Sequence, residues 1–289
     1  MAQYRDIFTL RQTMNRRDFE FYHYLDLDPP TVAFHYHDFY EVFFFVSGTV
    51  TYTVEGRSYQ LRPGDILLTN NRDIHRPETT PGKPYERYVL WITDSFLAQL
   101  QKSGDDLTAC FRDAEQKQYK LIRPDGDVLI RLQKLCVRIL RLQREDAFGS
   151  ATLLHAAVSE LLVYLNRAYF GTPSAIRQDV AEDDTVNRAV LYIEAHLTEE
   201  LTLDTLAEAV HLSKFYLNRR FKQFTGLTVH QFILKKRLIT ARTMLLSGVS
   251  AMDACMGCGF NDYSNFLKAF KREFLLSPRQ LLNNSTPPI

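Results

Sequence analysis

Two hydrophobic periods divide the first half of the chain. Between residues 31 and 92 apolar and polar positions alternate, as in Thr49–Val54, and turn residues follow at Glu55–Gly56 and Pro63–Asp65. Alternation with a period of two is typical of half-buried strands. This region therefore predicts an antiparallel β domain, and the unbroken apolar run Val42–Val46 predicts a central strand covered on both faces.

Beyond Trp91 the hydrophobic period becomes helical. Two segments, Asp127–Arg144 and Ala151–Phe170, place apolar residues on one helix face. The stripes consist of Leu129, Leu132, Cys136, Ile139 and Leu140 in the first segment and Leu154, Ala157, Val158, Leu161 and Leu165 in the second. We expect these helices to form a dimer interface. Packing against the β domain of the same chain is the alternative.

The stretch Gly171–Asp184 has no apolar period and contains glycine, proline and several charges, which is typical of a linker. We therefore expect four parts. These are a β domain over residues 1–93, a helical dimerisation segment over 94–171, a linker over 172–184 and a helical domain over 185–289.

The last part contains an internal repeat. Thr202 can cap a short helix and Ser213 a second one, and the same pattern returns 48 residues after Thr202, at Ser250, which has the capping-box spacing to Asp253. The turn of the second copy is one residue longer, so its later helix aligns at an offset of 49. Each copy reads as helix, tight turn, helix, which predicts two helix-turn-helix units.

The later helix of each unit buries one apolar face, so its opposite face is exposed and can bind a partner. Those opposite faces carry Lys214, Phe215, Asn218, Arg219 and Lys222 in the first unit, and Tyr263, Ser264, Asn265, Lys268 and Arg272 in the second. Amide and basic groups bond base edges and phosphates, and aromatic atoms touch thymine methyl groups. A charged helix face is usually only a solvated one, but its duplication favours binding to double-stranded DNA.

Charge supports this interpretation. Residues 185–289 hold 13 Lys/Arg and 8 Asp/Glu, a net charge of +5, whereas residues 1–184 carry 22 Lys/Arg and 26 Asp/Glu, a net charge of −4. The segment between the two units, Thr228 to about Ser247, predicts a helix of ~30 Å, close to the ~34 Å between major-groove entries on one face of DNA. The two units are therefore expected to read adjacent turns.

The remaining composition excludes other classes. No stretch approaches the ~18 apolar residues of a membrane helix, and no signal core follows the N-terminus, so we expect a cytoplasmic protein without a membrane partner. The four cysteines do not form a disulfide framework. Cys255 and Cys258 align with the core-facing Ala207 and Val210 of the first repeat, so we interpret them as small core residues rather than metal ligands.

With these motifs the C-terminal hundred residues resemble the AraC/XylS family of transcription regulators. The matching positions are Tyr192–Ile193, Leu206–Ala207, Leu212–Ser213, Leu217, Phe221–Lys222, Gly226, Arg237–Leu238, Ala241, Gly259–Phe260, Phe266, Phe270–Arg272 and Ser277–Pro278. The resemblance implies DNA binding by both units, usually to activate transcription with RNA polymerase as a partner. Two positions depart from the family pattern: Leu275 stands where the family usually has glycine, and Leu281–Leu282 where it often has Tyr-Arg.

A second resemblance lies in the β domain. His35, His37 and Glu41, followed by Gly48, have the spacing of the first cupin motif, and Pro63–Asp65 with the later His75 resembles the second. In metal-binding cupins such residues converge on a divalent transition metal inside the barrel. Sensor domains of AraC-type regulators also resemble cupins and often use similar residues without metal. We therefore expect structural or organic-ligand roles, with a metal site as the alternative.

Together these features predict an α+β protein with an N-terminal cupin-like antiparallel β-barrel, a helical dimerisation segment and a C-terminal all-α domain of two helix-turn-helix units joined by a linker helix. The expected effector site is His35, His37, Glu41, His75, Arg87 and Trp91, which suits a small polar molecule such as a carbohydrate.

The expected function is a ligand-responsive activator that works as a homodimer, with no catalytic residues, no cofactor and no metal. Two alternatives remain open. One is a metal-dependent cupin enzyme with a DNA-binding tail, and the other is a constitutive DNA-binding protein whose N-terminal half only dimerises.

Overall fold

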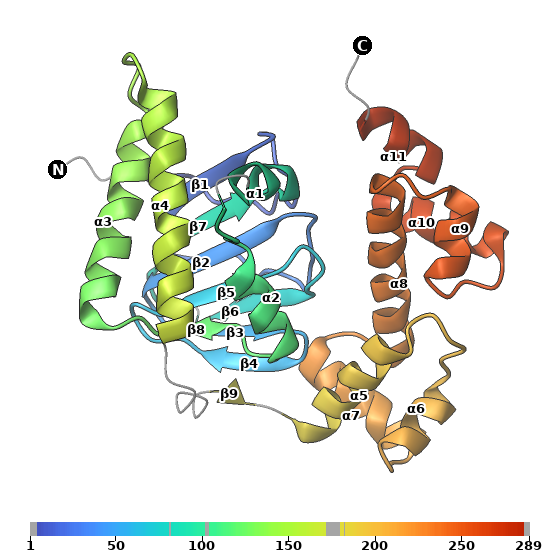
Figure 1. The fold of residues 1–289 in the computed structure, drawn as a ribbon. Coiled ribbons are helices and arrows are strands. Elements are labelled where there is room, and N and C mark those ends of the chain that lie inside the picture. Colours follow the sequence, from blue (N-terminus) through green and yellow to red (C-terminus); the bar gives the residue numbers. More distant parts are fainter. Residues whose placement is uncertain (1–4, 81, 102–103, 172–179, 182, 286–289) are drawn as a thin grey trace. The chain divides into compact units, whose positions relative to one another are not determined.

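The structure, a computed structural model, describes residues 5–80, 82–101, 104–171, 180–181 and 183–285 of the 289-residue chain (Figure 1). These residues form two compact units that divide after Ala181. Each unit has its own set of buried apolar side chains.

The N-terminal unit contains two antiparallel sheets. The larger sheet has the order β1 (Phe19–Asp26), β7 (Tyr85–Ile92), β2 (Tyr40–Ser47), β5 (Ile66–Thr69) and β8 (Leu121–Ile122). The smaller sheet has the order β6 (His75–Thr79), β3 (Val50–Val54), β4 (Arg57–Gln60) and β9 (Val180–Ala181). The antiparallel β domain predicted from the alternating pattern is confirmed, although β1, β8 and β9 lie outside the region that the pattern marked.

The hairpin between β3 and β4 shows how the sequence sets the strand register. Glu55 and Gly56 have φ angles of 48° and 82°, so both lie in the left-handed region that a two-residue type I′ turn requires. Val54 then faces Arg57 across the strands. The turn predicted at Glu55–Gly56 is confirmed.

Strand β2 lies in the middle of the larger sheet and is covered on both sides. Val42 and Phe44 pack into the core under the helices, whereas Phe43 and Phe45 pack into the core between the two sheets. The central strand predicted from the run Val42–Val46 is therefore confirmed, since alternate residues of one apolar run fill two different cores.

Four helices pack against the outer face of the larger sheet (Figure 1): α1 (Asp94–Gln101), α2 (Ala109–Gln116), α3 (Gly126–Leu142) and α4 (Ser150–Gly171). The apolar stripes of α3 and α4, among them Leu132 and Leu161, are buried in this core together with Phe21 and Leu90 of the sheet. The interpretation of these stripes as a dimer interface is therefore wrong. One apolar sheet face demands a cover, and α3 and α4 supply it within the chain.

The C-terminal unit is helical. It contains α5 (Asp184–Ala195), α6 (Leu203–Ala209), α7 (Lys214–Thr225), α8 (Val229–Leu246), α9 (Ala251–Gly257), α10 (Tyr263–Phe274) and α11 (Pro278–Ser285). The pairs α6–α7 and α9–α10 are the two predicted helix-turn-helix units, which are thus confirmed, and α8 joins them (Figure 1). At ~1.5 Å per residue its 18 residues span ~27 Å.

Side-chain caps define the helix starts in both units. The hydroxyls of Thr202, Ser213 and Ser250 accept hydrogen bonds from backbone N–H groups three residues later, as predicted. Thr228 forms a capping box at the start of α8, and Asp262 caps α10. Each cap satisfies a backbone donor that the helix itself leaves unpaired, which fixes where the helix begins.

The two recognition-type helices, α7 and α10, end in the same backbone conformation but with different residues. Gly226 after α7 has φ 72°, and Leu275 after α10 has φ 59°, both left-handed. Glycine adopts this conformation freely, whereas a leucine Cβ meets the following carbonyl oxygen. The departure from the family pattern at Leu275 therefore keeps the local geometry and strains the residue.

Most of the linker expected over residues 172–184 lies outside the described residues. Within it, Val180 and Ala181 form β9, which pairs with Tyr59 and Ser58 of β4. None of the described helices combines the length and the apolar character that a crossing of a membrane requires.

Candidate functional site

A small cavity lies in the N-terminal unit, and its volume is about 50 Å³. Four of the expected effector residues line it: His35, Glu41, Arg87 and Trp91. By the same measure a water needs ~10–15 Å³, so the cavity has room for only a few waters. A molecule the size of a sugar fits only after part of the lining has moved.

Part of that lining comes from the segment ahead of β1. Phe8, Arg11 and Gln12 line the cavity, and Arg11 is held by an ion pair of 2.7 Å with Glu20 at the start of β1. The Arg11 guanidinium also lies 5.3 Å from the ring of Trp91. This segment precedes every strand signal in the sequence, so sequence reasoning missed it.

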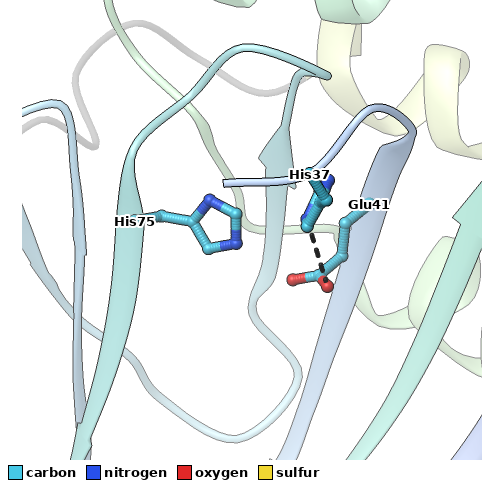
Figure 2. Close-up of side chains that lie close together, drawn as sticks. All are labelled: His37, Glu41 and His75. Carbon is cyan, nitrogen blue, oxygen red and sulfur yellow. Dashed lines mark ion pairs between the residues drawn. The ribbon is translucent and has the colours of Figure 1, made fainter. Parts of the chain in front are cut away.

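Beside the cavity the structure brings His37, Glu41 and His75 together, with their ligand atoms all within 4.8 Å of one another (Figure 2). His37 lies in the loop before β2 and Glu41 at the start of β2, and His75 begins β6 in the other sheet. All three are buried, with exposed fractions of 3%, 6% and 0%. Residues of the two cupin-like motifs therefore meet in space, although His75 lies eleven residues past Gly64 in the sequence.

Each imidazole of the cluster is held by a backbone carbonyl. The Nδ1–H of His37 donates to the carbonyl of Phe39 at 2.7 Å, and that of His75 donates to the carbonyl of Asp73 at 2.9 Å. In the neutral form of each ring, an Nδ1–H leaves the lone pair on Nε2. The Nε2 atoms of both residues are buried and have no hydrogen-bond partner.

The Glu41 carboxylate is held from two sides. Its Oε1 atom accepts a hydrogen bond of 2.9 Å from the hydroxyl of Tyr52, and Oε2 accepts one of 2.7 Å from the indole of Trp91. The Nε2 atom of His37 lies 3.7 Å from Oε2 (Figure 2). Trp91 was expected among the effector contacts, and the structure shows it orienting Glu41.

The charges follow from this environment. Burial favours the neutral acid and by itself would raise the pKa of Glu41, but the polar groups around the carboxylate, first His37, then His75 and Trp91, hold the pKa below its usual range. Burial lowers the pKa of His75 well below its usual value, and the nearby imidazoles of His35 and His37 add to this. The ionised carboxylate of Glu41 thus lies in the same cluster as the neutral imidazole of His75.

His35 lies at the edge of the cluster. Its backbone exchanges two hydrogen bonds, of 3.0 and 2.9 Å, with the backbone of His75, and the two rings are 4.3 Å apart. Its Nδ1–H donates to the carbonyl of Ala33 at 2.9 Å. Burial lowers the pKa of His35 as well. The residue therefore ties the loop before β2 to β6 and also lines the cavity.

Arg87 is buried and already engaged. Its guanidinium donates to Asp26 at 2.5 Å and lies 4.1 Å from the ring centre of Tyr85. The hydroxyl of Tyr85, which also lines the cavity, is buried without a hydrogen-bond partner, as is one Nη atom of Arg11. These two groups are cavity residues that the sequence motifs did not mark, and both are free to donate to a ligand oxygen.

The second candidate surface is the outer face of α7. Lys214, Phe215, Arg219 and Lys222 are exposed there, and Phe215 is 77% exposed. Single exposed apolar side chains are common on protein surfaces, so the exposure of Phe215 makes the ring accessible to a partner without identifying one. Lys214 is paired with Asp204 of α6 at 3.0 Å, a surface ion pair that contributes little to stability.

Asn218 differs from its neighbours. Its side-chain oxygen accepts a hydrogen bond of 3.1 Å from the backbone N–H of Val229, the first residue of α8. This hydrogen bond fixes α7 against α8 and orients the amide, and the NH₂ group keeps both of its donors for a base.

The corresponding face of α10 is formed by Ser264, Asn265, Lys268 and Arg272, which are all exposed. Tyr263 is half-buried and packs beside Phe266, with ring centres 6.0 Å apart. The structure therefore places four of the five expected residues of this helix in solvent and the fifth against the core.

The linker helix α8 is joined through adjacent lysines to α5 and to α10, the later helix of the second helix-turn-helix unit. Lys236 pairs with Glu194 of α5 at 3.1 Å, and Lys235 pairs with Glu273 of α10. Arg237 donates to the carbonyls of Leu197 and Glu199 at 2.9 and 2.6 Å. These contacts tie α8 to the elements on both sides of it.

Cys255 and Cys258 are buried, free thiols in the core of the second unit. Burial raises the pKa of both thiols, in the case of Cys258 to about 11. The interpretation of this pair as small core residues agrees with the structure.

Known protein families match both the N-terminal and the C-terminal unit. Residues 21–161 match an AraC-like ligand binding domain, and residues 206–284 match a helix-turn-helix domain. HTH-type transcriptional activator RhaS of Enterobacter sp. (strain 638) is 29% identical over 256 residues, which cover 87% of this chain and 88% of that protein. RhaS of Klebsiella pneumoniae (strain 342) is 27% identical over 258 residues, or 87% and 88% of the two chains.

Two solved structures are also similar. One is the C-terminal domain of AraT, a response regulator from Geobacillus stearothermophilus, with 30% identity, a TM-score of 0.36 and coverage of 37% of this chain and 89% of that one. The other is ToxT from Vibrio cholerae O395, with 16% identity, a TM-score of 0.38 and coverage of 94% and 100%.

Proposed function

The chain belongs to the AraC family of transcription regulators, and we propose that it activates transcription by binding duplex DNA in response to a small polar effector. The observation that carries the proposal is the pair of capped helix-turn-helix units whose recognition-type helices both present amide and basic side chains to solvent. The excess of basic residues in the same part of the chain supports it.

For the DNA contacts we propose the residues named from the sequence, in two groups. Phe215, Arg219 and Lys222 of α7, with Lys214 and the free NH₂ of Asn218, serve one half of the operator. Ser264, Asn265, Lys268 and Arg272 of α10, with the edge of Tyr263, serve the other half. Because α8 holds the two units at a set spacing, both enter successive major grooves of one DNA face.

The cavity and the adjacent cluster form the proposed effector site, with His35, His37, Glu41, His75, Arg87 and Trp91 as its walls. Free donors on Arg11 and Tyr85 and an acceptor on Glu41 suit a molecule with several hydroxyl groups, and Trp91 offers an apolar face. A carbohydrate has this chemistry. Since the cavity is small, effector binding requires the lining to move, which is a means of signalling.

Finer features of the architecture belong to the same proposal. We infer that the two sheets act as a cupin-like barrel, and that residues 1–93, 94–171, 172–184 and 185–289 serve as effector domain, helical segment, linker and DNA-binding domain. The related proteins are transcriptional activators by name, so we propose a regulator without catalytic activity rather than a metal-dependent enzyme. Chromosomal DNA and RNA polymerase as partners place its action in the cytoplasm.

We further propose a homodimer, now on different grounds. The faces of α3 and α4 that bury their stripes are occupied, but the outer face of α3 exposes Ile130 and Val137, and α4 exposes Leu153. Ile130 and Val137 are seven residues apart and so share one side of the helix. This outer face, rather than the stripes, is the proposed contact between two copies.

The test of the regulatory function uses the full-length chain and fluorescently labelled genomic fragments from its own promoter region. We expect salt-sensitive binding, and we expect Arg219→Ala and Lys268→Ala to alter protection of different halves of the operator, each at a cost of ~1–3 kcal/mol if a base contact is lost. Ser159→Ala, in the N-terminal unit, is the matched control. Protection changes over the same base pairs in both variants would refute the arrangement in two grooves.

A further inference from the structure

The two cupin-like motifs leave an uncompensated feature in the N-terminal unit. Among the described residues, the Nε2 atoms of His37 and His75 are buried and have no hydrogen-bond partner, and that of His37 lies 3.7 Å from Oε2 of Glu41. Burial of an unpaired polar atom costs free energy, so a native structure usually supplies it with a partner. Both atoms belong to the cluster around the Glu41 carboxylate (Figure 2).

We propose that His37, Glu41 and His75 bind one divalent first-row transition metal ion. This reverses the expectation drawn from the sequence, which favoured structural or organic-ligand roles for the cluster. The inference goes beyond the proposed regulatory function and does not rest on it, because a metal bound in the N-terminal unit needs neither DNA nor an effector.

The donor set determines the kind of ion. Two imidazoles with one carboxylate suit zinc, iron, cobalt, nickel or manganese, whereas magnesium and calcium prefer oxygen ligands alone. The Nε2 atom of His37 is already 3.7 Å from Oε2 of Glu41, and the whole set spans at most 4.8 Å. Bonds of ~2.0–2.2 Å place neighbouring donors ~3–4 Å apart, so small side-chain rotations close the set around an ion.

The residues behind the cluster hold it in the form that a metal requires. The carbonyls of Phe39 and Asp73 fix both imidazoles in the tautomer that directs Nε2 toward the cluster. Tyr52 and Trp91 hold the two carboxylate oxygens, and each oxygen keeps a further lone pair. Hydrogen bonds of this kind around metal ligands orient them and raise affinity.

Charge balance agrees with this assignment. Among the described residues, the ion pair recorded for Glu41 is with His37 at 3.7 Å and none is with a lysine or arginine, although only 6% of Glu41 is exposed. A buried anion without a full cationic partner is costly, and a divalent ion supplies the missing charge. Since Glu41 also lines the cavity, the ion would be within reach of a molecule bound there.

The test uses the full-length protein stripped with a chelator and titrated with Co²⁺ and with Zn²⁺. We expect one equivalent of either metal, with Co²⁺ giving visible absorption bands typical of nitrogen and oxygen ligands and no thiolate charge-transfer band. His75→Gln and Glu41→Gln should weaken binding by more than the ~10–100-fold that loss of an outer partner costs, and Tyr52→Phe should fall within that range.

The matched control is His23→Gln, a buried histidine whose Nε2 atom is paired with Glu86 at 2.8 Å outside the cluster. It should keep wild-type metal affinity. If the histidine variants fail to fold, Glu41→Gln decides, because it changes one atom and keeps the side-chain volume. A wild-type protein that retains no metal, or variants that bind like the wild type, would overturn the proposal. So would a thiolate band that Cys255→Ala abolishes, because it would place the ion at the cysteine pair of α9.

Discussion

Leu275, which follows α10, allows the free-energy cost of a left-handed backbone conformation to be measured. It occupies the left-handed conformation with φ 59°, and its side chain is 83% exposed. The left-handed conformation costs a residue with a Cβ roughly 1–2 kcal/mol, and an exposed side chain regains little by packing. We therefore expect Leu275→Gly to stabilise the C-terminal unit.

The magnitude is a difference of two effects. Relief of the steric cost stabilises the native state, and the extra freedom of glycine in the unfolded chain opposes it by about 0.5–1 kcal/mol. The difference between these ranges is roughly 0–1.5 kcal/mol, with a midpoint near 0.75 kcal/mol in favour of glycine. For a unit of this size 1 kcal/mol corresponds to a Tm shift of roughly 4–8 °C, so the variant should melt a few degrees higher.

Scanning calorimetry of the full-length chain measures this shift, with two controls. Leu275→Ala keeps a Cβ and should gain almost nothing. Gly226→Ala, at the equivalent position after α7 with φ 72°, should lose about 1 kcal/mol. A Leu275→Gly protein that melts at or below the wild-type temperature, together with a neutral Gly226→Ala, would show that the left-handed cap carries no strain.

Three further outcomes follow from particular contacts. Asn218→Ala should lose about 1 kcal/mol of stability as well as DNA affinity, because the side-chain oxygen of Asn218 caps α8. Asn265 is exposed, so Asn265→Ala should lose DNA affinity alone, and thermal melts with binding titrations separate the two effects. Val137→Glu on the outer face of α3 should yield folded monomers in sedimentation, whereas Leu132→Glu should unfold the N-terminal unit; a folded dimer of Val137→Glu would exclude that face. Hydrogen bonds to Glu20 outweigh its burial and lower its pKa, so the ionised carboxylate stabilises the fold above the usual carboxyl pKa of 4.5. The destabilisation by Glu20→Gln should therefore shrink as the pH falls below 4.5, and a pH-independent difference in urea unfolding would contradict this.

Sequence periodicity identified the buried faces but not their partners. The stripe that includes Leu132 was correctly recognised as apolar, yet nothing in a period of 3.6 says whether a sheet or a second subunit covers it. Strand β1 was missed because aromatic and polar residues occur on both of its faces, so the sequence FEFYHYLD shows no alternation between apolar and polar positions. Tertiary packing, which a local pattern does not record, decided both cases.

The candidate site was predictable only where a motif carried it. His37, Glu41 and His75 met in space because register and strand pairing turn motif spacing into proximity. Arg11 and Tyr85 reach the same cavity from segments without a motif, so no signal marked them. The amide of Asn218 was assigned to DNA because its role at α8 depends on a backbone N–H that the sequence cannot place.

The packing of α8 against α7 and against the second helix-turn-helix unit has a consequence for the DNA as well as for the protein. Because α8 packs on α7 through Phe232 and on the second helix-turn-helix unit through Leu238 and Leu245, a change in the distance or rotation between α7 and α10 would disrupt buried contacts. If α7 and α10 enter successive grooves as proposed, a mismatch between their spacing and the ~34 Å groove repeat must be absorbed by the duplex through bending or twisting. Base pairs between the two half-sites would thus influence affinity through their stiffness, although no side chain touches them.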